Sequence, residues 1–428
     1  MRYRFDRPRV VRELGAAALG VAPALRIRVS PLSPAETLEA QGCRVTLRRW
    51  KGPVAQEFYL HAAPVSANPD VGGQARALYR AVGEALATAG TGFDAISSEF
   101  CFLRHTSDAE AVRAARAQVV GAAKGDPTPP TLEVRQPPLQ ADAPLELSLQ
   151  AWVPTEPARF ESFAVRDEAP ARPPAPGQRI TLGEERRFTA HGIVGSGADA
   201  YAQTRAMFRA SDRLLADAGF GFEDVARTWI HLREMERDYD AFNRARRDFF
   251  AERSIDPPPA STGIGGAPVP EHHDLCLGLT AIATSGPGAP ERTVMTTPTL
   301  NEAPVYGSDF VRGLRVAEAN KVALYVSGTA SIDEAGQTVH AGDLEAQVER
   351  MLLNVATLLE RQDAGFGDIA SAITYLKHPA DAERLRAQLR AAGFDGFPHA
   401  LVAATVCRPD LLCETEVLAL RPAPASTT

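Results

Sequence analysis

The chain has little cysteine and no long hydrophobic run. Its five cysteines are odd in number and follow no framework spacing, which argues against a set of disulfides and favours a reducing compartment. No run of about eighteen apolar residues occurs, so no membrane-spanning helix is expected. The basic start, Met1–Arg7, is not followed by an apolar stretch, so we expect no signal peptide. These absences predict a soluble, cytoplasmic protein.

The charge balance and the missing motifs exclude further classes. A net charge of −7 argues against a nucleic-acid-binding surface. No metalloprotease, paired-cysteine or phosphate-loop pattern occurs, and His272-His273 has no carboxylate or cysteine at metal spacing, so no metal or cofactor is expected. The Arg-rich stretch Arg244–Arg247 lies on an amphipathic pattern, and we expect it to be a solvated helix face.

Three segments of the chain share one internal spacing. Each has a Gln that opens a helix and, nineteen residues later, a Phe that begins a short turn before a strand-like run. The three pairs are Gln74 and Phe93, Gln203 and Phe222, and Gln347 and Phe366. Segments rich in Pro and Gly, 168–177 and 285–290, separate the copies. We therefore predict three units, at residues 1–165, 166–298 and 299–428.

The third unit has the clearest secondary-structure pattern. Its periodicity predicts strands over 322–332, 372–376, 400–406 and 413–420 and helices over 343–361 and 379–391, the first capped by Asp343. The order ββαβαββ predicts an α+β fold with helices on one face of a mixed sheet. The other sheet face must then be covered, and three units in one chain could cover one another with pseudo-threefold symmetry.

The last predicted strand distinguishes the third copy from the other two. When the apolar tails are aligned, the first unit has Ser148 and Gln150, the second has Gly278 and Thr280, and the third has Glu414 and Glu416. Residues two apart on a strand point to the same face. The proximity of Glu414 and Glu416 should raise the pKa of one of the two carboxyl groups and make that group a proton donor or water activator. The alternative is a solvated strand edge with two acids of no function, and the apolar surroundings count against it.

The third unit resembles the Rid/YjgF/L-PSP superfamily. The similarity runs through Tyr325–Ile332, Gly365–Ile369, Phe397-Pro398 and Glu414–Glu416, and the shared spacing extends it weakly to the other units. It implies three Rid-like, chorismate-mutase-like units of a sheet and two helices, packed as a pseudo-trimer with sites between units. Rid deaminases also use an Arg just after the Phe-Pro turn, and this chain lacks it.

A closer resemblance is to the chorismatases, including 3-hydroxybenzoate synthases, through Val406–Glu414, Ser327–Ile332 and Val339–Asp343. It implies removal of pyruvate from chorismate or a related enol ether, giving a hydroxybenzoate or a dihydroxycyclohexadiene acid. Glu414 would protonate the enol-ether methylene, Glu416 would tune it, and Cys407 would lie beside the ring. For Cys407 the alternative is a small buried hydrophobe, and Cys413 should face the core.

Other functions stay open at this point. The chain could be a Rid-type hydrolase of imines or enamines, which the missing Arg counts against. It could also be a non-catalytic protein that binds a small aromatic or keto acid. We expect a monomer with an internal pseudo-trimer, or a weak homo-oligomer, whose partner is a small anionic aromatic precursor.

A dianionic substrate needs cations in the cleft. The loop from Tyr306 to Arg315 supplies Arg312 and Arg315 beside an aromatic residue, and we expect these three to hold a carboxylate; the alternative for Arg312 is a surface position. On the second unit, alternation places Arg227, Trp229, His231 and Arg233 on one strand face, which could meet the other carboxylate. The predicted substrate-binding set is completed by Gly328, Thr329, Tyr375 and His231.

Overall fold

Three mixed sheets with the same strand order form the framework of the protein. The computed structural model describes residues 31–66, 68–121, 129–164, 176–269, 272–284, 290–302 and 309–423. Tyr306 and most of the two Pro- and Gly-rich seams lie outside the described residues. Among the residues that are described, no helix is long and apolar enough to cross a membrane.

The third unit has the predicted order ββαβαββ, preceded by one further short strand. Its elements are β14 (Arg292–Val294), β15 (Gly313–Ala317), β16 (Val322–Ala330), α6 (Leu344–Glu360), β17 (Ile369–Leu376), α7 (Ala382–Ala391), β18 (His399–Ala403) and β19 (Cys413–Arg421). Asp343 caps α6 as expected, because its Oδ1 accepts a hydrogen bond from the backbone N–H of Ala346 at 3.1 Å. Helix and strand periodicity therefore located this unit correctly.

The other two units repeat the same order. The first contains β1 (Glu36–Ala40), β2 (Cys43–Lys51), β3 (Ala55–Pro64), α2 (Val71–Thr88), β4 (Ile96–Leu103), α3 (Ala109–Val120), β5 (Thr131–Arg135) and β6 (Leu145–Pro154). The second sheet and its helices contain β7 (Arg159–Ala164), β8 (Pro176–Leu182), β9 (Glu185–Ile193), α4 (Ala200–Asp217), β10 (Val225–Leu232), α5 (Met235–Arg253), β11 (Ala260–Gly265) and β13 (Leu275–Thr284). The shared spacing has a structural meaning, since each repeated Phe begins a 3-10 turn, at Phe93–Ala95, Phe222–Asp224 and Phe366–Asp368.

Equivalent strands occupy equivalent places in the three sheets. The orders are β1-β2-β3-β6-β4-β5-β12, β7-β8-β9-β13-β10-β11 and β14-β15-β16-β19-β17-β18. In each sheet one pair of strands is parallel, namely β4 with β5, β10 with β11 and β17 with β18. The short β12 (Ala267–Pro268) follows the second unit's β11 but pairs with β5, so the first sheet ends in a strand from the second unit.

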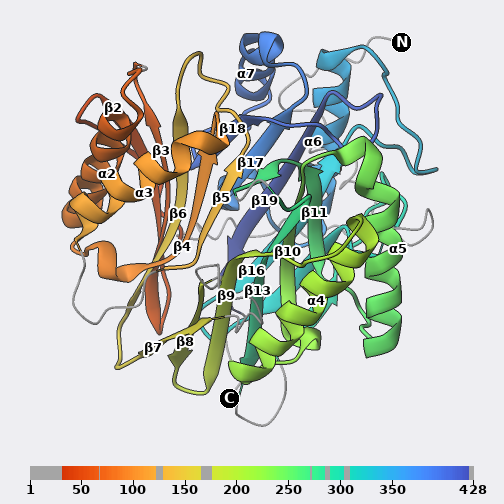
Figure 1. The fold of residues 1–428 in the computed structure, drawn as a ribbon, viewed down its shortest axis with the longest axis horizontal. Helices are drawn as coiled ribbons and strands as arrows, with labels where there is room; N and C mark the ends of the chain where they lie inside the picture. Colours follow the sequence, from red (N-terminus) through yellow and green to blue (C-terminus); the bar gives the residue numbers. More distant parts are fainter. Residues whose placement is uncertain are drawn as a thin grey trace, which may run out of the picture. The chain divides into compact units, whose positions relative to one another are not determined.

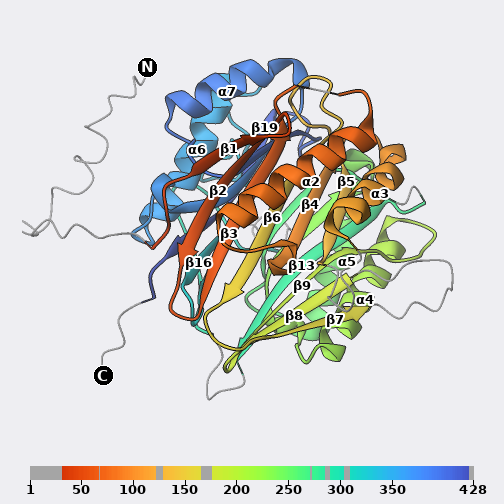
Figure 2. The ribbon, with the colours of Figure 1, turned by 90° about the vertical axis from the view of Figure 1, so that its left-hand side faces the viewer.

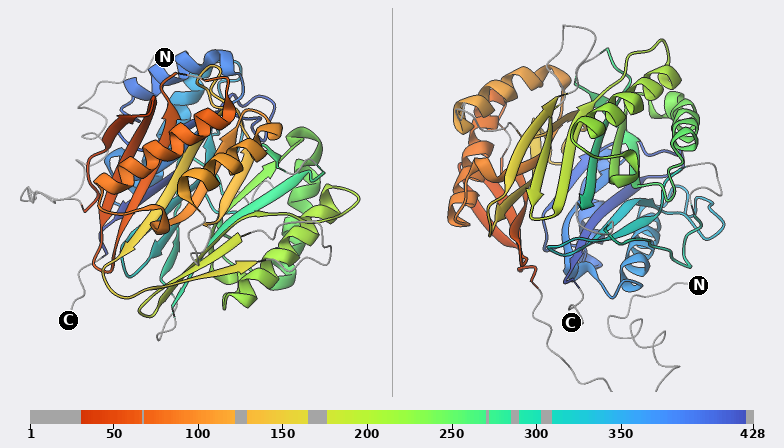
Figure 3. Two further views of the ribbon diagram at one scale, coloured as in Figure 1. Left: turned by 60° about the vertical axis from the view of Figure 1, so that its left-hand side comes forward. Right: turned by 90° about the horizontal axis from the view of Figure 1, so that it is seen from below.

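The helices lie on the outside and the sheets face one another. Figure 1 shows α2 and α3, α4 and α5, and α6 and α7 on different sides of the strands, and Figure 2 shows α2 and α3 across the first sheet. Viewed from below in Figure 3, the strands of all three sheets lie between the helix pairs. The inner faces share one apolar cluster, to which Trp50, Ala226 and Tyr325 each contribute from a different unit. The units therefore cover one another's sheets, as the α+β pseudo-trimer predicted.

A buried charge network also joins the three units. The Nζ of Lys321 lies 2.6 Å from Glu57 Oε1 and 2.7 Å from Glu318 Oε2, and Arg187 lies 3.2 Å from Glu318. Glu57 comes from the first unit, Arg187 from the second, and Glu318 and Lys321 from the third. Because an unpaired buried charge is costly, this network disfavours arrangements in which one unit is displaced.

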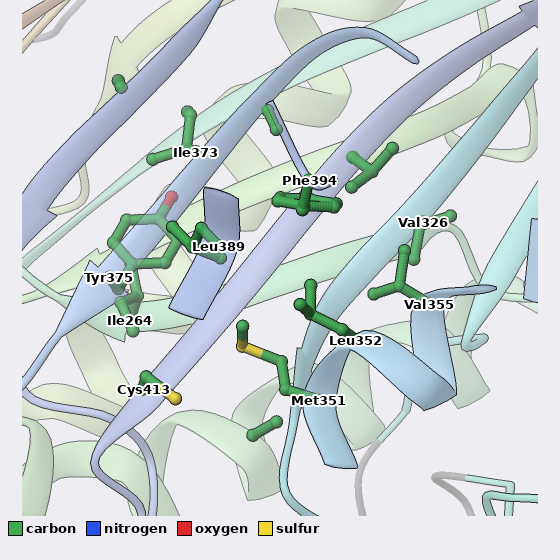
Figure 4. Packing of buried hydrophobic residues seen from close by; sticks show 14 of the residues in the cluster. Ile264, Val326, Met351, Leu352, Val355, Ile373, Tyr375, Leu389, Phe394 and Cys413 are labelled. Carbon is green, nitrogen blue, oxygen red and sulfur yellow. The ribbon is translucent and has the colours of Figure 1, made fainter. Parts of the chain in front are cut away.

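The core of the third unit lies between its sheet and its helices. In Figure 4, Met351, Leu352 and Val355 of α6 lie beside Val326 of β16, and Cys413 belongs to the same buried cluster. Cys413 is fully buried. Strand alternation therefore placed this cysteine in the core correctly, and it directs the next residue, Glu414, to the opposite face of the sheet.

Candidate functional site

Glu414 lies on the inner face of β19, between two neighbouring strands. Its backbone pairs with Ala330 of β16 and with Tyr375 of β17. The carboxyl group lies against Gly328, where an added Cβ would stand 1.9 Å from Glu414 Oε1. Burial, and next the charge of Glu416, raise the pKa of Glu414 to about 8. Glu414 therefore holds a proton at neutral pH, as expected for one member of the pair.

Residues of two units hold the carboxyl group of Glu416 in place. The indole Nε1 of Trp229 donates a hydrogen bond to Glu416 Oε1 at 2.6 Å, and Arg227 forms an ion pair with Oε2 at 2.9 Å. The hydroxyl of Tyr375 donates a third bond to Oε2 at 3.1 Å. Arg227, which the sequence placed on a strand face that could meet a substrate carboxylate, thus pairs with Glu416. The two carboxyl groups therefore have different surroundings.

A cavity of about 570 Å³ lies beside Glu414, between the second and third units. Helix α5 and strand β11 of the second unit form one side of it, and β16 with the segments before β15 and β19 forms the other. Its lining includes five arginines and two carboxyl residues, namely Arg244, Arg246, Arg247, Arg312, Arg408, Asp240 and Glu414. We call this space the Glu414 cavity. Its excess of cations suits a ligand with more than one negative charge.

The arginines of α5 correct a prediction from the sequence. Arg244–Arg247 was expected to be a solvated face, and Arg244 and Arg247 are indeed exposed, but Arg246 is only 2% exposed and all three arginines line the Glu414 cavity. The guanidinium of Arg246 lies 4.8 Å from the ring centre of Phe242 and 5.6 Å from that of Phe310. Arg312 approaches the same Phe310 ring at 5.5 Å. An amphipathic pattern shows that a face is polar, but not that another unit covers it.

The structure brings part of the predicted site together. Glu414, Cys407, Arg312 and Gly328 all line the Glu414 cavity. Burial raises the pKa of the Cys407 thiol to about 12, so it remains a neutral thiol beside the cavity.

Other predicted residues lie behind or away from the cavity. Glu416 and Tyr375 support Glu414 from the inner side of the sheet. The Thr329 hydroxyl donates to the Ser327 carbonyl at 2.8 Å. Arg315 pairs with Glu291 at 3.2 Å on the far side of β15, and His231 is buried on β10. Thr329, Arg315 and His231 are absent from the cavity lining within the described ranges.

Gln347 fixes the segment that carries Cys407 and Arg408. Its Nε2 donates to the carbonyl of Asp410 at 2.8 Å, and its Oε1 accepts from the N–H of Leu412 at 2.8 Å. Gln203 makes the corresponding contact in the second unit, where its Oε1 accepts from the N–H of Asp274 at 3.0 Å. In the second and third units the repeated Gln therefore ties the first helix to the segment before the last strand, whereas in the first unit Gln74 accepts a hydrogen bond from the N–H of Asn68 at 3.1 Å.

The strand registers correct the alignment of the three last strands. Tyr375 and Phe102 both stand nine residues after their repeated Phe, and they pair with Glu414 and Glu146. Glu146 is thus the counterpart of Glu414, and the prediction that the third unit alone carries this Glu is wrong. In the second unit the equivalent pair is His231 and Cys276. The alignment on apolar tails was displaced by two residues.

Comparisons with known proteins agree with this architecture. Residues 303–421 match the family described as Endoribonuclease L-PSP. A solved chorismatase superposes on 76% of this chain and 93% of its own, with a TM-score of 0.54 and 20% sequence identity. The solved YjgF gene product of E. coli covers 30% of this chain and 98% of its own at 22% identity, with a TM-score of 0.25.

An uncharacterized protein of Streptomyces coelicolor is 35% identical over 80 residues, which are 19% of this chain. The chain covers 58% of that protein's length. The sequence match is confined to the third unit, whereas the chorismatase match covers most of the chain. Residues 303–421 are therefore similar to the L-PSP family, and the described residues have a chorismatase-like fold.

Proposed function

We propose that the protein is a chorismatase-like enzyme that removes pyruvate from chorismate or a related enol ether. The observation that carries the proposal is the placement of a protonated Glu414 at the wall of a cavity lined by five arginines. Enol-ether cleavage needs a positioned acid, and a carboxyl kept neutral at pH 7 by burial can supply it. The similarity to the solved chorismatase adds support at the level of fold.

The proposed reaction begins with proton transfer from Glu414. The proton goes to the methylene carbon of the enol ether, whose double-bond electrons form the new C–H bond. The positive charge that develops on the ether-bearing carbon is shared with the ether oxygen. Water then adds to that carbon and returns a proton to Glu414, and the adduct collapses to pyruvate and a dihydroxycyclohexadiene acid. A hydroxybenzoate forms instead if the ring also loses one molecule of water and becomes aromatic, so that the reaction consumes no water overall.

The remaining residues bind and orient the substrate. Arg312 of the third unit and Arg246 of the second both approach the Phe310 ring, so carboxylates of the substrate can meet cations from both units. Arg227, Trp229 and Tyr375 hold Glu416 in place beside Glu414. Cys407 contributes a small neutral wall beside the ring.

The direct test is to incubate the protein with chorismate and measure pyruvate. We expect pyruvate release from the wild type and a fall in kcat of at least about a hundredfold in Glu414→Gln, because the variant keeps the shape but lacks the acid. Glu133→Gln is the matched control: it lies on strand β5, pairs with Arg113 outside the cavity, and should keep full activity. No pyruvate from folded wild type, or full activity in Glu414→Gln, would reject the proposal.

The same assay separates the two alternatives. A Rid-type hydrolase would release ammonia from an enamino acid and leave chorismate intact. A binding protein would raise its melting temperature with an aromatic or keto acid without any turnover. The position after the Phe-Pro turn bears on the first alternative. In the Glu414 cavity that position is filled by Ser261 of the second unit, so the carboxylate-binding Arg that the deaminase resemblance implies is absent there.

A further inference from the structure

A second cleft lies between the first and third units. It has a volume of about 190 Å³, and Glu146 of β6 and His61 of β3 form one side of it. His399 of β18 and Arg386 of α7 approach from the third unit. Its full lining is Arg44, Thr46, His61, Ala63, Pro64, Gln140, Glu146, Arg386, His399 and Leu401. We call it the Glu146 cleft.

The Glu146 cleft is the counterpart of the Glu414 cavity in another pair of units. Glu146 and Glu414 occupy the same strand position, as their pairing with Phe102 and Tyr375 shows. Gln140 and Arg408 stand six residues before them and also line their respective cavities. The parallel edge strands correspond as well.

Thr228 and Ala372 both follow their repeated Phe by six residues, and they pair with Ser261 and His399. Ser261 lines the Glu414 cavity, and His399 lines the Glu146 cleft. The repeated architecture therefore forms a second cavity between another pair of units, and this cavity has different lining residues. In the Glu146 cleft an imidazole, that of His399, stands where the Glu414 cavity has Ser261.

The polar groups inside the Glu146 cleft are partly occupied. His61 Nε2 lies 3.0 Å from Glu146 Oε2, so the carboxylate at the base of the cleft has a polar partner. His399 Nε2 lies 2.8 Å from the Thr374 hydroxyl. Burial lowers the pKa of His399, so this imidazole is neutral at pH 7 and can act as a hydrogen-bonding group. No group of three or more His, Cys, Asp or Glu residues in the described ranges is placed to hold a metal ion, which directs attention to an organic ligand.

Two arginines supply positive charge to the Glu146 cleft. Arg44 pairs with Glu39 at 2.6 Å and Arg386 with Glu383 at 2.7 Å, and the side chains of Glu39 and Glu383 are 57% and 82% exposed. Exposed ion pairs of this kind are weak, so a carboxylate inside the cleft can replace them. The Glu146 cleft has two arginines, whereas the Glu414 cavity has five, and its volume is a third as large. It therefore suits a ligand with one carboxylate, whereas the Glu414 cavity suits a ligand with two. Ala63, Pro64 and Leu401 supply apolar walls for a ring or a short alkyl chain.

We propose that the Glu146 cleft is a second binding site, which takes a small monocarboxylic acid with an aryl or short alkyl group. The ligand carboxylate is held by Arg386 and Arg44, its apolar part packs on Leu401, and His61 and His399 offer hydrogen bonds. The site is separate from the Glu414 cavity, because strands of the first unit form one of its sides, and α7 and β18 of the third unit form the other.

The test uses benzoate as the probe and the full chain labelled with ¹³C at its histidine rings. The chain has nine histidines, and the lining of the Glu414 cavity includes none, so the signals of His61 and His399 report on the Glu146 cleft alone. We expect both signals to shift saturably as benzoate is added. Arg386→Gln should weaken this binding by roughly tenfold, because a charge-assisted hydrogen bond is lost.

Arg384→Gln is the matched control on the same helix. Arg384 pairs with Glu345 and Asp381 on the surface and does not line the cleft, so its replacement should leave the binding curve unchanged. Absence of saturable shifts at His61 and His399 up to the solubility limit of benzoate would overturn the proposal. An unchanged binding curve in Arg386→Gln would do the same. Neither result depends on pyruvate release, so the two proposals fail separately.

Discussion

Trp229 of the second unit donates a hydrogen bond at 2.6 Å to Glu416 of the third. This contact, with the Arg227 ion pair, fixes the second carboxylate of the pair and leaves Glu414 facing the cavity. Without the second unit, Glu416 would keep only the hydrogen bond from Tyr375 of its own unit. The contacts that set Glu416 apart from Glu414 thus arise largely at the interface of two units.

The pH dependence of turnover should follow the protonation of Glu414. Burial and Glu416 raise its pKa to about 8, so the acid form prevails below that pH and is lost above it. We expect kcat to fall as the pH rises through about 8, by up to tenfold per pH unit. The measurement is pyruvate release from saturating chorismate on both sides of pH 8. A rate that stays level or increases through this range would show that Glu414 is not the acid.

The pH dependence of stability gives a second measure of the same group. A carboxyl whose pKa is higher in the folded than in the unfolded state binds a proton only when folded between the two pKa values, so stability falls as pH rises between 4.5 and about 8. The expected slope is about −1.4 kcal/mol per pH unit for one group. Urea unfolding of wild type and Glu414→Gln should therefore give a difference that changes with pH. Parallel curves for the two proteins would contradict the raised pKa.

The Arg227–Glu416 pair should be strongly coupled. Arg227→Met leaves a buried carboxylate without its cation, which we expect to lower the free energy of unfolding by about 3–5 kcal/mol. Adding Glu416→Gln removes the uncompensated charge, so the double variant should recover much of this loss. The measurement is urea unfolding of both single variants and the double variant at pH 7. Simple additivity of the two losses would mean that the ion pair does not hold Glu416.

Gly328 should matter for catalysis because Glu414 needs the space above it. An added Cβ at this position would lie 1.9 Å from Glu414 Oε1, so Gly328→Ala must displace the carboxyl. We expect kcat to fall about a hundredfold, since a displacement of about 1 Å can have that effect. Gly365→Ala is the control, because its Cβ would meet nothing within 4 Å and its backbone is extended. Equal activity of the two variants would show that the position of Glu414 is not critical.

Arg246 should contribute to substrate binding from the second unit. Arg246→Met keeps the packing against Phe242 and Phe310 but removes a cation, so we expect KM to rise about tenfold with a smaller change in kcat. Arg253→Met is the control on the same helix, because Arg253 pairs with Asp212 and lies outside the cavity. An unchanged KM in Arg246→Met would place the substrate carboxylates elsewhere.

Much of the fold was predictable because each element carries a local signal. The apolar positions of α6, the Asp343 cap and the strand containing Cys413 were all located from periodicity alone. The repeated Gln and Phe also marked real features, a tie to the last strand and the start of a 3-10 turn. These signals depend on residues close in sequence, so no knowledge of the other units was needed.

The alignment error has an equally physical cause. Side chains on a strand repeat every two residues, so displacing an alignment by two keeps every residue on the same face. The apolar tails therefore could not distinguish Ser148 from Glu146 as the partner of Glu414. Hydrogen-bond registers against β4 and β17 make the distinction, because they tie each last strand to a neighbour that the Phe spacing has already aligned.

The sequence by itself determined that there are three like units, where the helices and strands of the third unit lie, and that the pair Glu414 and Glu416 is a candidate site. Only the tertiary structure decided which unit faces which, and so which residues meet. Arg246 and Trp229 reach the third unit's acids, and His399 reaches Glu146 of the first unit, across interfaces between segments far apart in the chain. Local periodicity reports the geometry of one element, whereas a cavity depends on the packing of several.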